Sequence, residues 1–364
     1  MIATDPVLLR LIDRIREAGS RQGALDIRGG GTKAFYGEAP CGEPLDTAEL
    51  AGISVYEPSE LVITARAGTP LAELEAEIGT RGQCLPFEPP RFGAGGTGGG
   101  MVAAGLSGPA RASAGALRDH VLGVTLLDGR ADVLTFGGQV MKNVAGYDVS
   151  RVMAGSWGVL GVICEVSLKV LPAARATATL SFECDERQAL GRLHAWSAQA
   201  LPLSASSWHA GRLTLRLAGA AAAVGAARNT LGGVEIAPAM AETWWVALRD
   251  HRHEFFHLGA SELESGECLW RISVPAVAAP LDLPGSQFIE WGGAQRWWRS
   301  RAPAVELRDT ATRAGGHATL VRAADKAAGA FTRPAEPLMR IHRSLKQAFD
   351  PAGVFNRGRL YADF

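Results

Sequence analysis

Three glycine-rich stretches in the first half of the chain have the residue types that bind an anion through the backbone. They are residues 27–37 (IRGGGTKAFYG), 89–113 (PPRFGAGGTGGGMVAAGLSGPARAS) and 141–163 (MKNVAGYDVSRVMAGSWGVLGVI). Glycine has no Cβ, so a ligand can approach its N–H group closely. Consecutive free N–H groups form concavities that bind anions, phosphate among them. The stretches therefore predict contacts to phosphate groups, although residues 27–37 alone are equally compatible with a tight turn.

The second stretch contains a dinucleotide-binding pattern in the wrong context. Residues 93–98 (GAGGTG) match G-x-G-x-x-G, which in Rossmann folds follows a central parallel strand. The preceding residues 85–91 (LPFEPPR) contain three prolines, and proline does not occur in central strands. The chain has no G-x-x-x-x-G-K-[ST] pattern either, which excludes a P-loop. We expect instead a helix over residues 99–108 whose first N–H groups face a pyrophosphate.

The separation of the three stretches bears on the size of the ligand. A mononucleotide turn uses one glycine loop, whereas three loops of one domain are glycine-rich here. One long ligand, contacted at several points, explains this arrangement. A dinucleotide such as FAD is long enough to reach all three loops, and its pyrophosphate carries the negative charge that such loops bind.

A second motif competes with this interpretation. Residues 253–257 (HEFFH) fit H-E-x-x-H, the zinc metallopeptidase pattern, in which His253 and His257 would lie on one helix face with Glu254 between them. The third ligand would be a glutamate among residues 262–267. A five-residue pattern with two free positions recurs by chance, and large aromatic residues surround this one. We therefore favour a partly buried amphipathic helix and predict no metal site.

Composition argues against several other classes of protein. The 364 residues carry 37 Lys plus Arg and 37 Asp plus Glu, so the formal net charge is zero, unlike that of a typical nucleic-acid-binding protein. The five cysteines show no C-x-x-C spacing, which argues against a disulfide framework and against zinc or iron–sulfur sites. The N-terminal residues predict an amphipathic helix ending near Gly19 rather than a signal peptide. We expect a soluble protein.

The elements that must position the glycine loops alternate between strand-like and helix-like patterns over residues 25–172. Residues 60–68 predict a strand, and residues 69–82 a helix with Thr69 as N-cap and Gly82 beyond its end. Residues 120–136 predict a hairpin that turns at Asp128-Gly129. Residues 161–172 predict a last strand that a proline ends.

A different pattern begins after Pro172. Residues 177–236 read as strand, helix, strand, helix, strand, with residues 206–219 (SSWHAGRLTLRLAG) as the middle strand. A second round of three strands, a helix and a strand follows from residue 268. We predict a second domain of antiparallel sheet plus helices over residues 173–330. Residues 331–364 predict a helix, a break at Asp350-Pro351 and an extended end.

The glycine stretches and the tail resemble FAD-binding domains of the vanillyl-alcohol oxidase/p-cresol methylhydroxylase (PCMH) type. The matching segments are RGGGTK (28–33), TGGGMVAAGLSGPARASAGALRDHVLGVTLLDG (97–129), KNVAGYDVSRVMAGSWGVLGVICEVSLKVLP (142–172) and FDPAGVFNRG (349–358). The last resembles D-P-x-x-x-[FL]-N-P-G, with Arg357 in place of the usual proline. Nearly the full chain resembles the FAD-binding E-type subunits of bacterial glycolate oxidases, including CLWRISVP, FIEWGGAQRWW and GGHATLVRA.

The resemblance implies an α+β fold. A two-subdomain PCMH-type FAD-binding domain would cover residues 1–172, and a second α+β domain, the cap, residues 173–330. The tail, residues 331–364, would pack back on the FAD domain. Some relatives attach FAD covalently through a histidine in the first loop, and because Thr32 stands at that position we expect non-covalent FAD.

The family's binding residues carry over by position. The pyrophosphate would bind backbone N–H groups of the first two loops, and the ribityl and adenine parts would contact Arg118, Asp119 and the third stretch. His317 and Asn356 are the candidates for residues that face the flavin, with a hydrogen-bonded structural histidine as the favoured alternative for His317. The implied FAD-binding residues are Arg28, Gly29, Gly30, Gly31, Thr32, Lys33, Gly95, Thr97, Gly98, Gly99, Gly100, Met101, Arg118, Asp119, Gly155, Gly158, Gly161 and Ile163.

The implied function is that of an FAD-binding subunit in a glycolate (2-hydroxyacid) oxidase or dehydrogenase complex. Glycolate would be oxidised to glyoxylate, and electrons would pass through flavin to an iron–sulfur partner. The implied partners are a hydroxyacid-oxidising flavoprotein subunit and an iron–sulfur subunit, in the cytoplasm or at the periphery of the inner membrane. The alternatives are a non-catalytic FAD-binding assembly subunit, a stand-alone flavin oxidoreductase for another 2-hydroxyacid such as D-lactate, and the zinc metallopeptidase.

Overall fold

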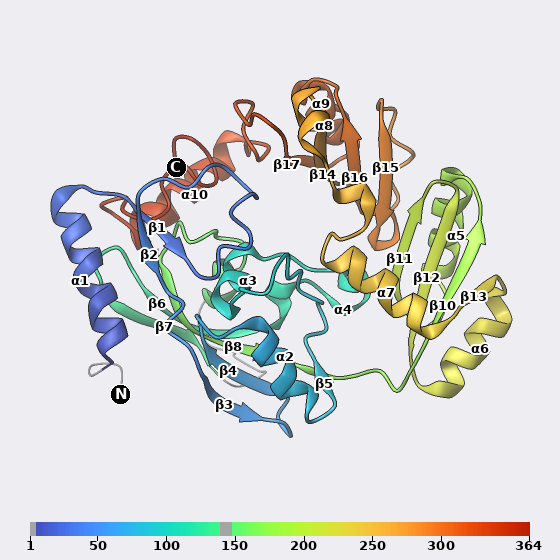
Figure 1. Cartoon of the computed structure of the whole chain (residues 1–364), viewed down its shortest axis with the longest axis horizontal. Coiled ribbons are helices and arrows are strands. Elements are labelled where there is room, and N and C mark those ends of the chain that lie inside the picture. The colour runs from blue at the N-terminus through green and yellow to red at the C-terminus, as the bar shows by residue number, and fades with distance from the viewer. Residues whose placement is uncertain (1–4, 139–147) are drawn as a thin grey trace. The chain divides into compact units, whose positions relative to one another are not determined.

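The computed structural model describes residues 5–138 and 148–364, and these form two units that each draw on separate stretches of the chain (Figure 1). The first unit takes its described residues from Met1–Leu106, Ala116–Pro172 and Arg333–Phe364. The second consists of Ser107–Gly115 and Ala173–Thr332. Residues 107–115 thus belong to the second unit, although they lie inside the sequence range predicted for the first domain.

An antiparallel sheet forms the centre of the first unit. β4, β6 and β8 consist mainly of apolar and small residues and are buried along most of their length. The helices α2 (Leu71–Gly79) and α3 (Gly98–Ala104) pack apolar residues into the same core, and burial of this apolar surface stabilises the unit. The strand order is β3–β4–β8–β6–β7, with β3 at Ile53–Glu57, β4 at Val62–Arg66, β6 at Val121–Leu127, β7 at Val133–Gly137 and β8 at Val162–Lys169.

The predicted hairpin at Asp128-Gly129 is confirmed, because β6 and β7 pair as antiparallel strands across this turn. The buried Asp128 carboxylate closes it: Asp128 Oδ1 accepts hydrogen bonds from Arg130 N (2.8 Å) and Asp132 N (2.9 Å). Aspartate is a common turn residue because its side chain can bond the backbone two residues further on.

The predicted helix after Gly68 is confirmed, but Thr69 does not cap it. α2 begins after Pro70, which makes no side-chain capping bond. Thr69 Oγ1 instead accepts from Gly52 N (2.9 Å) and lies 2.7 Å from Arg66 O. The threonine therefore fastens the loop between β4 and α2 to residue 52, and Pro70 stands at the N-cap of the helix, where its fixed φ suits a helix start.

A smaller layer adjoins this core. α1 (Pro6–Arg21) buries Leu8, Leu11 and Ile15 in an apolar cluster with Leu25 of β1. β1 (Leu25–Arg28) pairs in parallel with β2 (Glu43–Asp46). The remaining short elements of the unit are β5 (Gln83–Cys84), β9 (Leu171–Pro172) and the 3₁₀ turns η2 (Leu117–His120) and η3 (Ser150–Met153).

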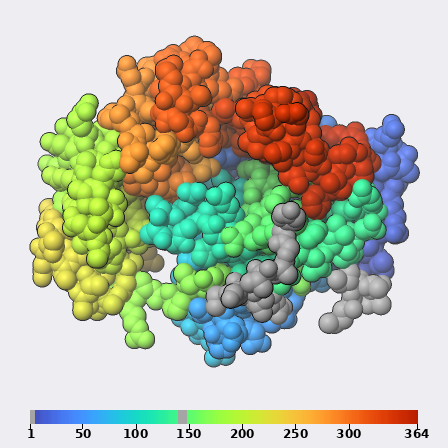
Figure 2. All heavy atoms as spheres, turned by 180° about the vertical axis from the view of Figure 1, so that it is seen from behind, coloured from blue at the N-terminus to red at the C-terminus, as the bar shows by residue number. Residues whose placement is uncertain are grey.

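The C-terminal tail belongs to the first unit. α10 (Glu336–Phe349) buries Met339, whereas Leu338 and Ile341 are exposed (the C-terminal segment is red in Figure 2). The residues after Pro351 form turns rather than the extended end predicted from the sequence, with one bridge between Phe355 and Leu25 of β1. The tail thus continues the edge of the β1–β2 pair.

The second unit is built on an eight-stranded antiparallel sheet. Its helices are α4 (Arg111–Ala114), α5 (Glu186–Ser197), α6 (Ala221–Leu231), α7 (Pro238–Arg249), α8 (Ala260–Glu264) and α9 (Ala304–Arg313), with the 3₁₀ turns η4 (Glu254–Phe256) and η5 (Trp291–Gly293). The strand order is β13–β10–β12–β11–β15–β16–β14–β17, with β10 at Ala176–Glu183, β11 at Leu203–His209, β12 at Arg212–Gly219, β13 at Val234–Ile236, β14 at Cys268–Ser273, β15 at Ser286–Glu290, β16 at Gln295–Ser300 and β17 at His317–Arg322.

Residues 206–219 are a hairpin, not the single strand predicted from the sequence. The chain turns at Ala210 and Gly211, whose φ angles are +48° and +81°. Two successive positive φ angles are typical of a two-residue hairpin turn, which usually carries Asn-Gly or Asp-Gly. Because Ala210 stands at the first position, the sequence lacks the usual Asn-Gly or Asp-Gly signal for this turn.

The HEFFH segment does not form the amphipathic helix predicted from the sequence, which a zinc site of this type would also require. α7 ends at Arg249, and Glu254–Phe256 form the separate 3₁₀ turn η4. His253 Nδ1 accepts from Phe255 N (3.2 Å), and its ring packs against Trp244 and Phe288. Within residues 5–138 and 148–364, no group of three or more His, Cys, Asp and Glu side chains is arranged to hold a metal ion. The segment belongs to an aromatic cluster.

Helices that cross a bilayer need about 20 predominantly apolar residues. In the described parts of the chain, no helix combines enough length with enough apolar character to cross a bilayer.

Candidate cofactor site

A cavity of about 370 Å³ lies in the first unit, where five segments of the chain meet. They are residues 26–47 around β1 and β2, Ala67 after β4, α3 with its N-cap, residues 157–163, and the tail. The sequence-predicted FAD residues that line it are Arg28, Gly29, Gly30, Gly31, Thr32, Lys33, Thr97, Gly99, Gly100, Gly158, Gly161 and Ile163. The fold thus brings all three glycine stretches to one cavity.

Gly30 brings the first two glycine stretches into backbone contact. A Cβ on Gly30 would lie 1.3 Å from the carbonyl oxygen of Gly95 and 2.3 Å from its carbon. A Cβ on Gly29 would lie 2.4 Å from Thr97 Oγ1. Only residues without side chains permit these loops to approach so closely, and their contact forms one wall of the cavity.

The helix expected over residues 99–108 forms as α3 but is shorter, because it ends at Ala104 and Gly105 caps it with a φ angle of +63°. Thr97 is its N-cap, and Thr97 Oγ1 accepts from Gly100 N at 3.2 Å. Gly99 packs on Ala67, where an added Cβ would lie 2.6 Å from the alanine Cβ. α3 is therefore held close to β4, and Gly99 and Gly100 at its start face the cavity. Their N–H groups are already engaged within the protein, because Gly99 N donates to Ala67 O at 2.7 Å and Gly100 N to Thr97 Oγ1. Contact of the start of α3 with a pyrophosphate stays a prediction.

The third stretch reaches the cavity through residues 157–163, while its residues 141–147 lie outside the described residues. Gly158 has a φ angle of +72°, and a Cβ there would lie 2.7 Å from Asn356 Nδ2. Trp157, also at positive φ (+52°), stacks on Tyr36 with ring centroids 5.2 Å apart. This stretch joins the cavity wall to the tail.

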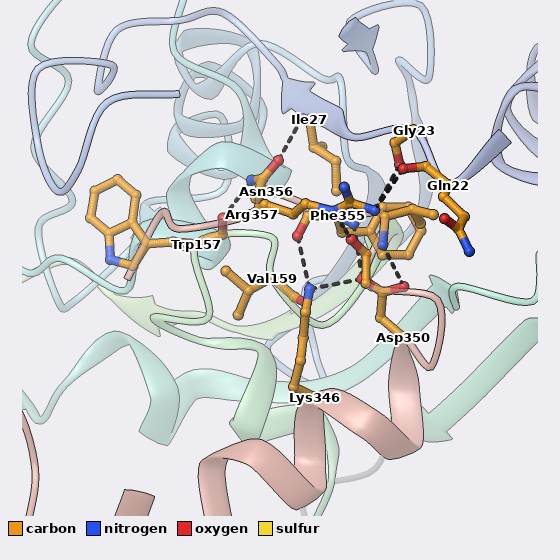
Figure 3. A network of polar contacts seen from close by, with 12 residues as sticks. Gln22, Gly23, Ile27, Trp157, Val159, Lys346, Asp350, Phe355, Asn356 and Arg357 are labelled. Carbon is orange, nitrogen blue, oxygen red and sulfur yellow. Dashed lines mark hydrogen bonds and ion pairs between the residues drawn. The ribbon is translucent and has the colours of Figure 1, made fainter. Parts of the chain in front are cut away.

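Asn356 bridges two walls of the cavity. Its Oδ1 accepts from Ile27 N of β1 (2.7 Å), and its Nδ2 donates to Trp157 O (2.6 Å) (Figure 3). Its backbone N–H also bonds Leu25 O at 2.9 Å. Both ends of the side-chain amide are thus engaged by the backbone of the protein. The structure places Asn356 at the cavity, and its hydrogen bonds to Leu25, Ile27 and Trp157 give it a positioning role there.

We expect Asn356→Asp to weaken FAD binding about tenfold. The aspartate can still accept from Ile27 N, but its second oxygen would face the carbonyl oxygen of Trp157 instead of donating to it, at a cost of about 1–3 kcal/mol. Quenching of flavin fluorescence on titration of the apoprotein measures the change. Wild-type affinity in this variant would show that the bridge does not shape the cavity.

A buried carboxylate holds the tail in place below Asn356. Asp350 Oδ2 accepts from Lys346 Nζ (2.7 Å) and Phe355 N (2.8 Å), and Oδ1 accepts from Val354 N (2.9 Å) (Figure 3). Lys346 Nζ also donates to Val159 O at 2.7 Å. Burial lowers the pKa of Lys346, and the adjacent Asp350 partly offsets this. The network fixes both the tail and the loop that follows Trp157.

Arg359 is a cavity residue that the sequence analysis missed. It is buried, and its guanidinium donates to the carbonyl oxygens of Glu38, Lys33 and Ala34, the last two at 3.3 Å. Its Cζ lies 5.4 Å from the centroid of the Trp157 ring. Arg359 thus fixes the chain after the first glycine loop. No local pattern in the tail indicates these contacts, because the partners lie more than 300 residues earlier.

The cationic side chains at the cavity differ in what surrounds them. Arg28 Nε lies 2.5 Å from the buried carboxylate of Asp26. Lys33 is 8% exposed, and burial lowers the pKa of its ammonium group to about 8. A buried cation facing a cavity lined by glycine N–H groups fits a negatively charged ligand.

Six other predicted residues do not line the cavity. Met101 is buried in the core, and Gly98 packs against Leu74. Arg118 and Asp119 lie in η2, with their side chains 3.9 Å apart, and Asp119 Oδ2 accepts from Ala116 N. The remaining two are Gly95, whose carbonyl faces Gly30, and Gly155, whose N–H bonds Val102 O.

His317 belongs to the second unit. It is the first residue of β17 and pairs with Ser273 of β14. Desolvation and the positive charge of Arg271 lower the pKa of its imidazole. A role for His317 toward a flavin stays a prediction.

Comparison with known proteins identifies the family. Residues 10–137 match the family model described as "FAD binding domain". The chain is 46% identical to the glycolate oxidase subunit GlcE of Escherichia coli over 353 residues, 97% of both chains. The chain belongs to the GlcE family. The predicted PCMH-type α+β fold and the assignment of FAD as the cofactor are confirmed.

More distant relatives share part of the GlcE-family sequence. The glycolate oxidase subunit GlcD of Bacillus subtilis is 28% identical over 42% of this chain and 33% of its own length. A D-lactate dehydrogenase of Archaeoglobus fulgidus is 31% identical over 43% of this chain and 35% of its own length. A structure of alkyldihydroxyacetonephosphate synthase, 14% identical, superimposes with a TM-score of 0.64 over 95% of this chain and 73% of that chain, which shows a shared fold.

Proposed function

We propose that this chain is the FAD-binding subunit of a glycolate (2-hydroxyacid) oxidase or dehydrogenase complex. The observation that carries the proposal is the 46% identity to the E. coli glycolate oxidase subunit over 97% of both chains. The cavity supports it, because glycine loops and a buried ammonium group suit the pyrophosphate of a dinucleotide.

The chain's own residues would hold the cofactor without a covalent bond. Backbone N–H groups of Gly29, Gly30 and Gly31 and the ammonium of Lys33 would bind the pyrophosphate, and Asn356 and Arg359 would keep the loops in position. Among the described residues that line the cavity there is no His, Cys or Tyr to attach a flavin. Bound FAD supplies a hydride acceptor for the carbon that bears the substrate hydroxyl.

The finer assignments follow from the family. We infer that the subunit works with a hydroxyacid-oxidising flavoprotein subunit and an iron–sulfur subunit, with glycolate as the substrate of the complex. The partial similarity to a GlcD subunit supports a flavoprotein partner of related fold. We place the complex in the cytoplasm, with at most peripheral contact to the inner membrane.

The visible absorption spectrum of the purified chain, before and after acid precipitation, tests the proposal. We expect flavin bands that move to the supernatant, because no covalent bond holds the cofactor. A colourless protein that stays colourless after incubation with FAD would contradict the proposal. Flavin that stays in the pellet would contradict the non-covalent assignment alone.

Addition of glycolate to the native protein under anaerobic conditions tests the role of its own flavin. Bleaching by glycolate means that this subunit oxidises the substrate, and bleaching by D-lactate alone changes the assigned substrate. Flavin bands that persist with both substrates, but bleach once the partner subunits are added, identify a subunit for assembly or electron transfer.

A further inference from the structure

The helix α10 of the tail carries apolar side chains on its outer face as well as on its inner one. On the inner face Met339 is buried, and Phe349 packs against the core of the first unit. On the outer face Leu338 is 49% exposed and Ile341 is 57% exposed. These two residues stand three positions apart and are therefore neighbours on the helix surface. Single exposed apolar residues need no explanation, whereas contiguous ones mark interaction sites.

An open groove of about 520 Å³ runs along the outer face of α10. Its lining residues are Pro337, Arg340, Ile341, Ser344 and Leu345. These positions follow the i, i+3, i+4, i+7, i+8 pattern of one helix face. Leu338, Ile341 and Leu345 stand at spacings of three and four, the spacing at which one helix packs along another. The groove therefore suits an α-helix of another protein.

The groove also carries a positive charge. Arg340 lines it, and in the part of the chain that the structure describes this arginine forms no ion pair. Arg343, by contrast, pairs with Glu336 and Asp363. Opposite charges across an interface steer association and fix its register. The surface complementary to this groove therefore has a carboxylate beside its apolar residues.

Contacts on the inner face hold α10 in place. Lys346 Nζ donates to Val159 O (2.7 Å), to Phe355 O (2.8 Å) and to the Asp350 carboxylate (2.7 Å). Leu345, which lines the groove, also packs against the core of the first unit. The outer face is thus presented on a fixed helix, and a rigid surface loses little conformational entropy on binding.

These features fit a protein partner better than a lipid surface or a second copy of this chain. A helix that lies on a membrane buries a continuous apolar face, whereas Arg340 and Ser344 stand within this one. A two-fold contact of α10 with its own copy would bring the same arginines together, and like charges on neighbouring helix positions are destabilising. The proposed function supplies a protein partner, because it makes this chain one subunit of a complex.

We propose that the outer face of α10 binds a partner subunit of the complex, through an amphipathic helix of that partner that carries apolar residues and a carboxylate. Leu338, Ile341 and Leu345 pack against the apolar residues of the partner, and Arg340 pairs with its carboxylate. This inference rests on the proposed function and deepens it, because it assigns the assembly of the complex to residues that lie outside the cofactor cavity.

The experiment measures the affinity of the full-length, FAD-loaded chain for its purified partner subunits by biolayer interferometry. Ile341→Glu should weaken binding at least about 30-fold, because it places a charge in the middle of the apolar strip. Arg340→Glu should weaken binding about tenfold, mainly by slowing association. Both variants should keep the flavin content and the unfolding midpoint of the wild type, because the two residues are exposed and lie outside the cavity lining.

Two variants in the second unit are the matched controls. Val305→Glu places the same charge at an apolar residue of α9 that is 63% exposed. Arg187→Glu reverses the charge of an exposed arginine of α5. Both should bind the partner subunits as the wild type does, so a loss confined to the α10 variants assigns the contact to this helix.

Several results would overturn the proposal. Wild-type affinity for the partner subunits in Ile341→Glu is one of them. Weaker binding accompanied by loss of flavin or by a lower unfolding midpoint is another, because it would give Ile341 a structural role. Sedimentation of the chain, alone and with phosphatidylglycerol vesicles, tests the other occupants. Dimerisation or vesicle binding that Ile341→Glu abolishes, while the complex still forms, would assign the face to a second copy or to a membrane.

Failure of the proposed function has a different signature. A wild-type chain that binds FAD but no partner subunit would contradict the assignment to a complex, and the docking surface with it. A wild-type chain that binds its partner subunits but no FAD would contradict the cofactor assignment alone. A complex that forms equally well with wild type and with Ile341→Glu would leave the proposed function intact and overturn only the docking surface.

Discussion

Gly30→Ala should reduce FAD affinity by at least 100-fold and lower the stability of the first unit. The new Cβ would lie 1.3 Å from the Gly95 carbonyl oxygen, and both atoms that it meets first belong to the backbone. Real Cβ atoms do not approach other atoms so closely, so the two glycine loops must separate. Overpacking of this kind costs typically 1–3 kcal/mol and occasionally more, and here it also opens the cavity wall.

The measurements are flavin fluorescence titration of the apoprotein and thermal unfolding followed by circular dichroism. Gly96→Ala is the matched control, because its Cβ would meet neighbours no closer than 3.6 Å and the residue does not line the cavity. We expect the control to bind FAD like the wild type. Binding of FAD by Gly30→Ala with unchanged affinity would show that the contact between the loops is not needed for the site.

Asp350→Asn should be the most destabilising isosteric change in the tail. The carboxylate accepts three hydrogen bonds, from Lys346 Nζ, Val354 N and Phe355 N, and is buried. An amide at this position can accept on one side only, and its NH₂ group would face either donor groups or the ammonium. Breaking a buried charge pair in this way costs about 3–5 kcal/mol, which corresponds to a fall of roughly 5 to 20 °C in the unfolding midpoint of the first unit.

A second carboxylate of the tail provides the comparison for Asp350. Asp363 pairs with Arg333 and Arg343 at the surface, where about half of each side chain is exposed. Because surface ion pairs contribute little, Asp363→Asn should leave the unfolding midpoint nearly unchanged. Differential scanning calorimetry of both variants, with and without FAD, resolves the two units if they unfold separately. Equal midpoints for Asp350→Asn and Asp363→Asn would contradict the role given to the buried network.

Local patterns in the sequence were sufficient to predict most elements of the fold. Asp128 marks the hairpin because its carboxylate bonds the backbone of its own turn. The helix α3 was predicted from the small residues that follow the glycines, and its N-cap, Thr97, bonds a residue only three positions later. In both cases the stabilising contact lies within a few residues, so its signal is present in a short window of sequence.

The features that the sequence analysis mispredicted or missed depend on contacts between residues far apart in the chain. Thr69 bonds Gly52 rather than the helix that follows it, so tertiary contact overrode a good capping residue. Asn356 and Arg359 contact Ile27 and Lys33 from the other end of the chain. The glycine loops could be recognised as parts of one site, but nothing in their sequences indicates that the tail closes it.

The bridge from Asn356 to β1 has a consequence for biosynthesis. Ile27 and Asn356 are separated by 329 residues, and the ribosome adds the whole second unit between them. Domains usually fold in the order of their synthesis, the N-terminal one first, but here the first unit cannot close until its own tail, which follows the whole second unit, has been translated. The nascent chain must therefore carry an open cofactor cavity for most of its elongation, and the capture of FAD becomes a late step of maturation.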